Sequence, residues 1–351
     1  MTGTAAIEEQ VRRLGADVRE LVPALADQFG ALSGLAEADQ VVLVGNGDSL
    51  HACMAAELAF TTTARLRCTA RCAQRLADYP GADWITPRTL VIGISVSGSS
   101  PRVVEALAAA ATLGASTLAV TGNRDSALAQ AAQHLVIPVL PGLRPGPGVR
   151  THQANLLALL VAAVHLAQAR GAIDGAAARE LTRELADTGR AVDHTAELVR
   201  PVCRAAAAEI AAAPVRFLLG TGPGFGTASF AAAKLVEAAG APSFAQDVEE
   251  WWHVERFCRP TDMPIIQIAQ PGPTRARAVA LAQRASGIGR RVLTVTRAQD
   301  TDFAPGTVLP TATVPREEFS PLVHSVFAPL LAAAVADALG RRPFLGDLVT
   351  G

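Results

Sequence analysis

The chain has 351 residues and a formal net charge of −1; half of its residues are hydrophobic and 18% are charged. This composition predicts a folded globular protein of about two domains and excludes a disordered chain. The near-zero charge gives no electrostatic argument for binding nucleic acid or a membrane surface. No run of about twenty uninterrupted apolar residues indicates a membrane span.

The first segment, 1–30, is predicted to be an amphipathic helix. It lacks a basic stretch followed by an apolar one, so we do not expect a secretion signal. The five cysteines are odd in number and scattered, which argues against disulfides and fits a reducing cytoplasm: Cys53, Cys68, Cys72, Cys203 and Cys258. Cys68 and Cys72 would share a helix face, but no matching Cys or His pair completes a zinc site, so core cysteines are expected.

A self-similarity at an offset of about 175 residues organises the chain. VVLVGNGDS (41–49) matches FLLGTGPGF (217–225), and each reads as an apolar strand, Gly-x-Gly and an alanine-rich helix. TLVIGISVSGSS (89–100) matches MPIIQIAQPGPT (263–274), and a further helix and strand follow in each half. Short strands that are apolar on both faces and alternate with helices predict an α/β fold, with a doubly wound parallel sheet in each half.

The repeat sets the expected domain boundaries. A first sheet domain is expected over 31–175 and a second over 213–340, with a helical connector over 176–212 and a C-terminal tail over 341–351. In doubly wound sheets, ligands bind beyond the carboxyl ends of the strands. The loops that follow the quoted strands of the first half would lie at that edge.

Four serines follow the second quoted strand of the first half: Ser95, Ser97, Ser99 and Ser100. Serine hydroxyls donate hydrogen bonds, and a loop that enters a helix presents unpaired N–H groups and a partial positive charge. The neighbouring loop adds three further candidates: Gly47, Asp48 and Ser49. Asp48 would bond a sugar hydroxyl or amine, or serve as an N-cap. We expect an anion cradle, above all for phosphate, whereas the alternative is that the serines only cap helices and form turns.

The second half lacks these hydroxyls, having AQPGPT at the matching place, so only the first half is expected to bind the anion. Neither glycine-rich loop is the dinucleotide fingerprint, and no GxxxxGK[ST] stretch is present. No two histidines and a carboxylate stand at metal-ligand spacing. We therefore expect neither a cofactor nor a metal.

Two copies of strand–Gly-x-Gly–helix and strand–serine loop–helix resemble the sugar isomerase (SIS) domain in tandem, from about residue 30 to the C-terminus. The order is similar to the isomerase half of glucosamine-6-phosphate synthase and to deglycases that split phosphorylated Amadori sugars. The resemblance implies a phosphate cradle at Ser49, Ser95, Ser97 and Ser100. The synthase's glutaminase domain has no counterpart in this sequence, so no release of ammonia from glutamine is expected.

The resemblance also implies a catalytic glutamate on the first helix of the second domain and a histidine 16 positions later, here Glu237 and His253. Glu237 would move a proton between C1 and C2 of the sugar, which requires a base poised near the working pH in an apolar pocket. His253, reaching in from the neighbouring subunit, would open the ring. Lys234 corresponds to a family lysine near the substrate hydroxyls. Without the resemblance, Lys234 and Glu237 would be interpreted as an exposed helix pair and His253 as a capping or packing residue.

Several positions depart from the family pattern. Asp347 stands where the synthases carry a lysine near the C-terminus, which disfavours glucosamine-6-phosphate synthesis and favours a relative with other chemistry. Val96 replaces a glutamine of the cradle and Ser99 replaces an acidic residue. The anion is therefore phosphate held differently, or another tetrahedral group such as a sulfonate.

A sugar-contacting segment of the family resembles GPGVRTHQ here, with Arg150 and His152 where small residues are common. Thr151 is a candidate substrate-binding residue by resemblance, and by its residue type a helix cap. Arg150 would either bind a second anion, such as the carboxylate of an amino acid linked through the sugar nitrogen, or lie in solvent.

The sequence therefore predicts a cytoplasmic tandem SIS enzyme that acts on a phosphorylated sugar or amino sugar by proton transfer at C1/C2. Aldose–ketose isomerisation and deglycation or deamination of a conjugate share this chemistry. The alternative is a non-catalytic regulator that binds a sugar phosphate, which the pair Glu237 and His253 and the lack of a preceding helix-turn-helix segment disfavour. We expect a homodimer with a shared site, and neither nucleic acid nor a membrane as a partner.

Overall fold

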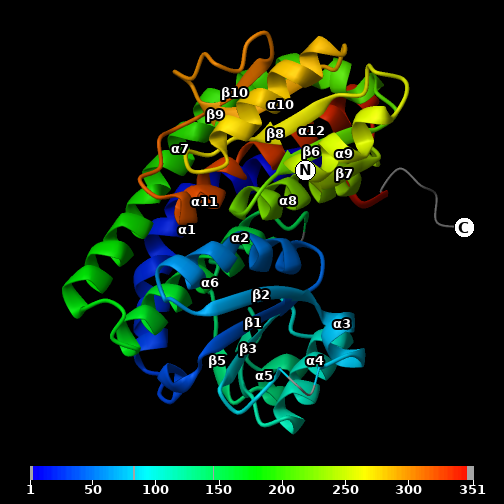
Figure 1. Cartoon of the computed structure of the whole chain (residues 1–351). Helices are drawn as coiled ribbons and strands as arrows, with labels where there is room; N and C mark the ends of the chain where they lie inside the picture. Colours follow the sequence, from blue (N-terminus) through cyan, green and yellow to red (C-terminus); the bar gives the residue numbers. More distant parts are fainter. Residues whose placement is uncertain (1–2, 82–83, 145, 346–351) are drawn as a thin grey trace, which may run out of the picture. The chain divides into compact units, whose positions relative to one another are not determined.

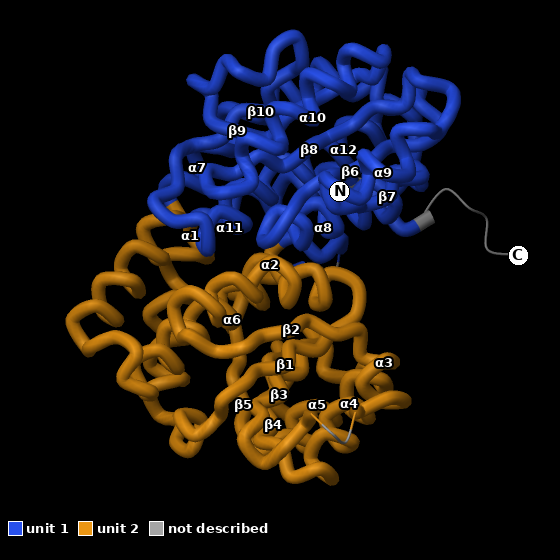
Figure 2. The backbone as a smooth tube through the Cα atoms, in the orientation of Figure 1, with its two compact units in different colours: residues 1–15, 144–149, 190–351 blue, residues 16–143, 150–189 orange. Residues whose placement is uncertain are grey.

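The computed structural model describes residues 3–81, 84–144 and 146–345. The chain forms two compact units, which Figure 2 shows in different colours. Unit 1 comprises 1–15, 144–149 and 190–351, and unit 2 comprises 16–143 and 150–189. Each unit contains one five-stranded parallel sheet, so the predicted α/β fold with a doubly wound sheet in each half is confirmed.

Sheet A belongs to unit 2 and has the strand order β2-β1-β3-β4-β5, with every neighbouring pair parallel. Its strands are β1 (Gln40–Gly45), β2 (Arg67–Cys72), β3 (Thr89–Ile94), β4 (Ser116–Val120) and β5 (His134–Val136). The central strand β3 is buried along its whole length, as its run of apolar residues predicts for a strand covered on both faces.

Helices cover both faces of sheet A (Figure 1). They are α2 (Asp48–Thr62), α3 (Ala73–Asp78), α4 (Pro101–Thr112), α5 (Ala127–Ala131) and α6 (Arg150–Ala169), with most of α1 (Gly3–Gly30) and the short η1 (Leu35–Glu37). On one face, α2 packs against α6. On the other, Val42 and Val91 of the sheet share a buried apolar cluster with Leu107 of α4.

Sheet B belongs to unit 1 and has the order β7-β6-β8-β9-β10, which repeats the topology of sheet A with β6 in the place of β1. Its strands are β6 (Arg216–Gly220), β7 (Ser243–Asp247), β8 (Ile265–Ile268), β9 (Val292–Arg297) and β10 (Thr307–Thr311). The identical strand order supports the internal repeat seen in the sequence.

The helices of unit 1 again lie on both faces of the sheet (Figure 1). They are α8 (Pro223–Ala239), α9 (Val248–His253), α10 (Arg275–Gly287), α11 (Ser320–His324) and α12 (Phe327–Leu339), with η2 (Glu255–Phe257), η3 (Glu317–Phe319) and η4 (Pro343–Leu345); α7 (Gly175–Ala212) is shared with unit 2. On one face α8 packs against α12, and on the other Phe217, Trp251 and Leu281 share a buried cluster.

Two further strands extend each sheet beyond the three that the apolar pattern predicts. They are β2 and β5 in sheet A and β7 and β10 in sheet B. No residue of β2 is fully buried, so its sequence, RCTARC, carries no apolar run.

The expectation that Cys68 and Cys72 share a helix face is wrong, because both lie on β2, and Cys72 is exposed rather than part of the core. Within the described ranges, no cluster of His, Cys, Asp or Glu could hold a metal ion.

The segment Glu317–Leu339 is long and apolar enough to cross a membrane, but 78% of its most apolar window is buried inside the protein. Such burial is that of a core helix. His324, the last residue of α11, is fully buried in this segment, and desolvation lowers the pKa of its imidazole to about 4.

This histidine predicts a pH-dependent stability. Because the imidazole of the unfolded chain titrates near its ordinary value of 6.5, the unfolded state takes up the proton first as the pH falls. The contribution of His324 to the free energy of unfolding is complete above about pH 6.5 and is lost on the way down to about pH 4. Between about pH 7.5 and 5 we expect urea unfolding to show a loss of about 2 kcal/mol that the His324→Phe variant lacks. Equal pH dependence of the two proteins would contradict this assignment.

Candidate functional site

The residues expected to hold an anion lie on two loops at the carboxyl edge of sheet A. Ser95 follows β3, and Ser100 stands directly before α4. Ser49 lies in the first turn of α2, which follows β1, the parallel neighbour of β3. The structure therefore brings the two loops to one edge, with the N-termini of α2 and α4, where ligands of such sheets bind.

Backbone contacts fix the serine loop, residues 95–100. The carbonyl oxygen of Val96 accepts hydrogen bonds from the N–H of Gly122 at 3.0 Å and from the hydroxyl of Thr121 at 3.3 Å. Gly98 has a φ of +67°, and a Cβ added there would lie 2.0 Å from Oγ of Ser126. Only glycine fits this approach, so the loop is held against the segment after β4 without the use of its own hydroxyls.

The serine side chains differ in burial and in partners. Ser95 is buried, whereas Ser97 and Ser99 are exposed, and their hydroxyl oxygens lie 2.7 Å apart in a hydrogen bond. Ser100 is the N-cap residue of α4 but makes no side-chain capping bond. The capping interpretation of the serines therefore does not account for Ser100.

On the neighbouring loop, Gly47 is the N-cap of α2, with a φ of +51°, and a Cβ added there would meet open space. Asp48 is the first residue of the helix instead of its cap, and its Oδ1 lies 3.9 Å from Nδ1 of His51. Nδ1 of His152 donates to the carbonyl oxygen of Asp48 at 3.0 Å. Asn155 donates to Oγ of the buried Ser49 at 3.4 Å. His152 and Asn155 of α6 thus hold this loop in place through two hydrogen bonds.

Asn155 is a residue that the sequence reasoning did not assign. It is buried on α6, where apolar and alanine residues dominate. A buried amide in such a helix is a signal that Asn155 shares with Gln153, and it could have singled out both residues, since buried amides need hydrogen-bond partners.

Arg150 begins α6 and is buried, with an exposed fraction of 4%. Its Nε and Nη2 donate to the two carboxylate oxygens of Asp17 at 2.6 and 2.7 Å, and Nη2 also donates to the carbonyl oxygen of Pro141 at 3.1 Å. The expectation that Arg150 lies in solvent is wrong, and its guanidinium is already engaged by a carboxylate of the protein. Because α6 begins before Thr151, Thr151 lies within the first helical turn instead of capping it.

The buried pair predicts a structural role for Arg150. We expect Arg150→Met to lower the free energy of unfolding by about 3–5 kcal/mol, because Asp17 keeps a buried charge without the guanidinium. The double variant Asp17→Leu/Arg150→Met removes both charges and should regain most of that loss in urea unfolding. A single variant as stable as the wild type would show that the pair does not carry this role.

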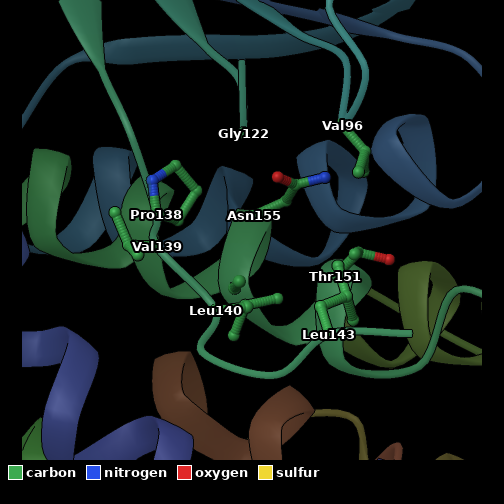
Figure 3. A pocket seen from close by; sticks show the side chains of 9 residues that line it. Val96, Gly122, Pro138, Val139, Leu140, Leu143, Thr151 and Asn155 are labelled. Atoms are coloured by element: carbon green, nitrogen blue, oxygen red, sulfur yellow. The ribbon is translucent and has the colours of Figure 1, made fainter. Parts of the chain in front are cut away.

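A pocket of about 190 Å³ lies beside the serine loop in unit 2 (Figure 3). Val96 and Gly122 contribute from the ends of β3 and β4, and Thr151 and Asn155 contribute from the start of α6. The remaining lining residues are Pro138, Val139, Leu140, Leu143 and Ala154. The lining is largely apolar, with one hydroxyl and one amide.

In unit 1, Lys234 and Glu237 lie one turn apart on α8, and Nζ of Lys234 donates to the carboxylate of Glu237. The side chain of Lys234 is 2% exposed and that of Glu237 is 31% exposed. The ammonium also lies 5.2 Å from the centre of the Phe230 ring. The pair is therefore not an exposed helix pair, because a buried cation holds a carboxylate that reaches the surface.

His253 ends α9 with 65% of its side chain exposed, and its Nε2 lies 3.4 Å from Oε1 of Glu249. The adjacent Trp251 is fully buried, so the packing role near this position belongs to the tryptophan rather than to the histidine. Asp347 lies outside the described residues.

In sheet B, side chains of the protein itself lie at the loop that matches the serine loop. Nε2 of Gln270 donates to the carbonyl oxygen of Thr221 at 3.0 Å and to Oε1 of Glu317 at 3.4 Å. A Cβ added to Gly272 would lie 2.3 Å from Oε2 of Glu317. Burial raises the pKa of this carboxyl group. A carboxylate at this edge disfavours a second anion, in line with the expectation that only the first half binds one.

Residues 34–165 match the family model described as the SIS domain. The matched residues lie in unit 2, apart from 144–149. The glutamine–fructose-6-phosphate aminotransferase (isomerizing) of Gloeobacter violaceus is 26% identical over 261 residues, which are 74% of this chain and 42% of that protein. The chain thus spans less than half the length of the first curated relatives, 42% and 49% of them.

Two solved structures share the fold over nearly the whole chain. The C-terminal domain of glucosamine-fructose-6-phosphate aminotransferase from Francisella tularensis has a TM-score of 0.86 and 17% identity, and covers 97% of both chains. Glucosamine-6-phosphate deaminase from Thermotoga maritima has a TM-score of 0.75 and 17% identity, and covers 97% of this chain and 96% of that one. At these identities the likeness shows the fold alone.

Proposed function

We propose that this protein is a cytoplasmic tandem SIS enzyme that acts on a phosphorylated sugar or amino sugar by proton transfer at C1/C2. The observation that carries the proposal is the Lys234–Glu237 pair, in which a buried ammonium holds a carboxylate that is open to solvent. A protein that only binds a sugar phosphate has no need of such a base. The names of the relatives, an isomerizing aminotransferase and a deaminase of sugar phosphates, agree with this chemistry. The five cysteines, all free, agree with a reducing compartment.

The phosphate would bind at the edge of sheet A. Phosphate oxygens accept hydrogen bonds, and the hydroxyls of Ser49, Ser95, Ser97 and Ser100 are donors on two adjoining loops. The N-termini of α2 and α4 add N–H groups and positive dipole ends. Ser99, bonded to Ser97, would orient that hydroxyl.

Glu237 would act as the base on the opened sugar. It takes the proton from C2, and the electron pair of that C–H bond becomes the C1–C2 double bond. The π pair of the C1=O bond, or of the C1=N bond when C1 carries nitrogen, moves to the oxygen or nitrogen, which takes up a proton and gives an enediol or an enolamine. Return of the proton to C1, with loss of the proton from the C2 hydroxyl, gives the ketose or its amino derivative. Lys234 would hold the carboxylate in place and offer its positive charge to the substrate oxygens.

Ring opening is assigned to His253. Its exposed position at the end of α9 makes the imidazole accessible to a second copy of the chain. A homodimer in which each subunit lends His253 to its partner's site is therefore part of the proposal. Deglycation and deamination would use the same base to form an imine, and water would then hydrolyse its C=N bond to release the amine or ammonia.

The test is proton exchange in D₂O with hexose phosphates, aminosugar phosphates and phosphorylated Amadori compounds. We expect deuterium to appear at C1 or C2 of one class of substrate, and NMR measures the rate of its incorporation. The Glu237→Gln variant should lose about 10²–10⁴-fold in exchange rate and still bind the compound, because the amide cannot take a proton.

Glu180→Gln is the matched control, since Glu180 forms an exposed pair with Arg183 at the same helical spacing. It should exchange at the wild-type rate. If Glu237→Gln keeps that rate, Glu237 is not the base. If the wild type binds compounds of every class and exchanges none, the protein is a sugar-phosphate-binding regulator instead of an enzyme.

A further inference from the structure

We infer that the pocket beside the serine loop takes an uncharged, apolar substituent that the substrate carries beyond its sugar phosphate. The inference rests on the proposed function, because it takes the serine loop to hold the phosphorylated sugar. It narrows the substrate class to conjugates whose second part is aliphatic or aromatic.

The lining and size of the pocket favour such a group. Val96, Val139, Leu140 and Leu143 contribute side chains, and none of the described lining residues is charged. The pocket holds about 190 Å³. A dry cavity of about 150 Å³ with aliphatic walls is large enough to bind benzene. A branched alkyl or phenyl group therefore fits this space.

The apolar side chains around the pocket are also left exposed to solvent. Val139 is 64% exposed, Leu143 is 39% exposed and Val96 is 38% exposed. These are three of the ten large apolar side chains that stand out as exposed in the described parts of the chain, and they gather at one pocket. An apolar ligand group would remove them from water, which is a favourable free-energy change.

Two residues of the pocket lining are direct neighbours of the phosphate cradle. Val96 stands between Ser95 and Ser97, so one short stretch of backbone serves both. Asn155 lines the pocket and donates to Oγ of Ser49 in the cradle at 3.4 Å. In Figure 3, Val96 and Gly122 lie on one side of Asn155, and Leu140 and Leu143 lie on the other. A single ligand can therefore reach from the cradle into the pocket.

A charged substituent is disfavoured at the same place. Two cations stand next to lining residues along the chain, and neither is itself in the lining. Arg144 follows Leu143 and is exposed, whereas Arg150 precedes Thr151 and its guanidinium is paired with Asp17. A ligand carboxylate in the pocket would lose water without gaining a cation among the described lining residues. The amide of Asn155 and the hydroxyl of Thr151 suit a neutral polar atom near the point of attachment.

The test compares three synthetic 6-phosphates of 1-amino-1-deoxyfructose by calorimetry with the Glu237→Gln protein, which prevents turnover. The amine is unsubstituted, N-isobutyl or N-carboxyethyl. We expect the isobutyl compound to bind at least about tenfold more tightly than either of the others. Leu143→Ser should lower the affinity for the isobutyl compound about tenfold and leave the affinity for the unsubstituted amine unchanged.

Tyr79→Ser is the control, because Tyr79 is an apolar side chain of the same unit, 78% exposed and outside the pocket lining. It should change none of the three affinities. Equal affinities for all three compounds, or a tighter carboxyethyl compound, would overturn the inference and leave the proposed function standing. If none of the three phosphates nor any other sugar phosphate binds, the proposed function fails, and the inference falls with it.

Discussion

Both sheets depend on a turn in which the first strand ends at glycine and the chain enters a helix at once. A Cβ added to Gly45 would lie 2.8 Å from the backbone of α2, and one added to Gly220 would lie 2.2 Å from the backbone of α8. The cap glycines that follow, Gly47 and Gly222, have φ values of +51° and +58°. Because no side chain fits between strand end and helix, the N–H groups of each helix begin at the ligand edge of its sheet.

The two repeats keep this turn and differ in what they place beside it. In sheet A the loop after β3 presents hydroxyls, and the carbonyl oxygen of Val96 bonds it to the segment after β4. In sheet B the corresponding loop binds Glu317 through Gln270, so a carboxylate of the chain itself occupies the edge. The helix after β6 instead carries Lys234 and Glu237. We therefore expect the two copies to differ in role, with an anion at the edge of sheet A and a base on α8.

The apolar strands, the repeat and the serine loop could all be predicted from the sequence, because burial on both faces and glycine at a tight turn leave a local pattern. Strand β2 could not, since an edge strand with partial burial needs no apolar run. The partner of Arg150 could not either, because Asp17 is 133 positions away and only the folded chain brings them together. The pocket could not be predicted for the same reason, because Val96, Pro138 and Asn155 come from separate loops and a helix. In the sequence, Val96 indicates only a departure from the family pattern.

We propose that the serine loop of sheet A, and not its counterpart in sheet B, holds the phosphate. Ser100 and Thr274 occupy matching positions as N-cap residues of α4 and α10, and neither makes a side-chain capping bond. Calorimetric titration with a hexose 6-phosphate that the wild type binds measures the claim directly. Ser100→Ala should weaken binding by about tenfold or more, through loss of one hydrogen bond to a charged group, and Thr274→Ala should leave it unchanged. The assignment would be contradicted if Thr274→Ala weakened binding and Ser100→Ala left it unchanged.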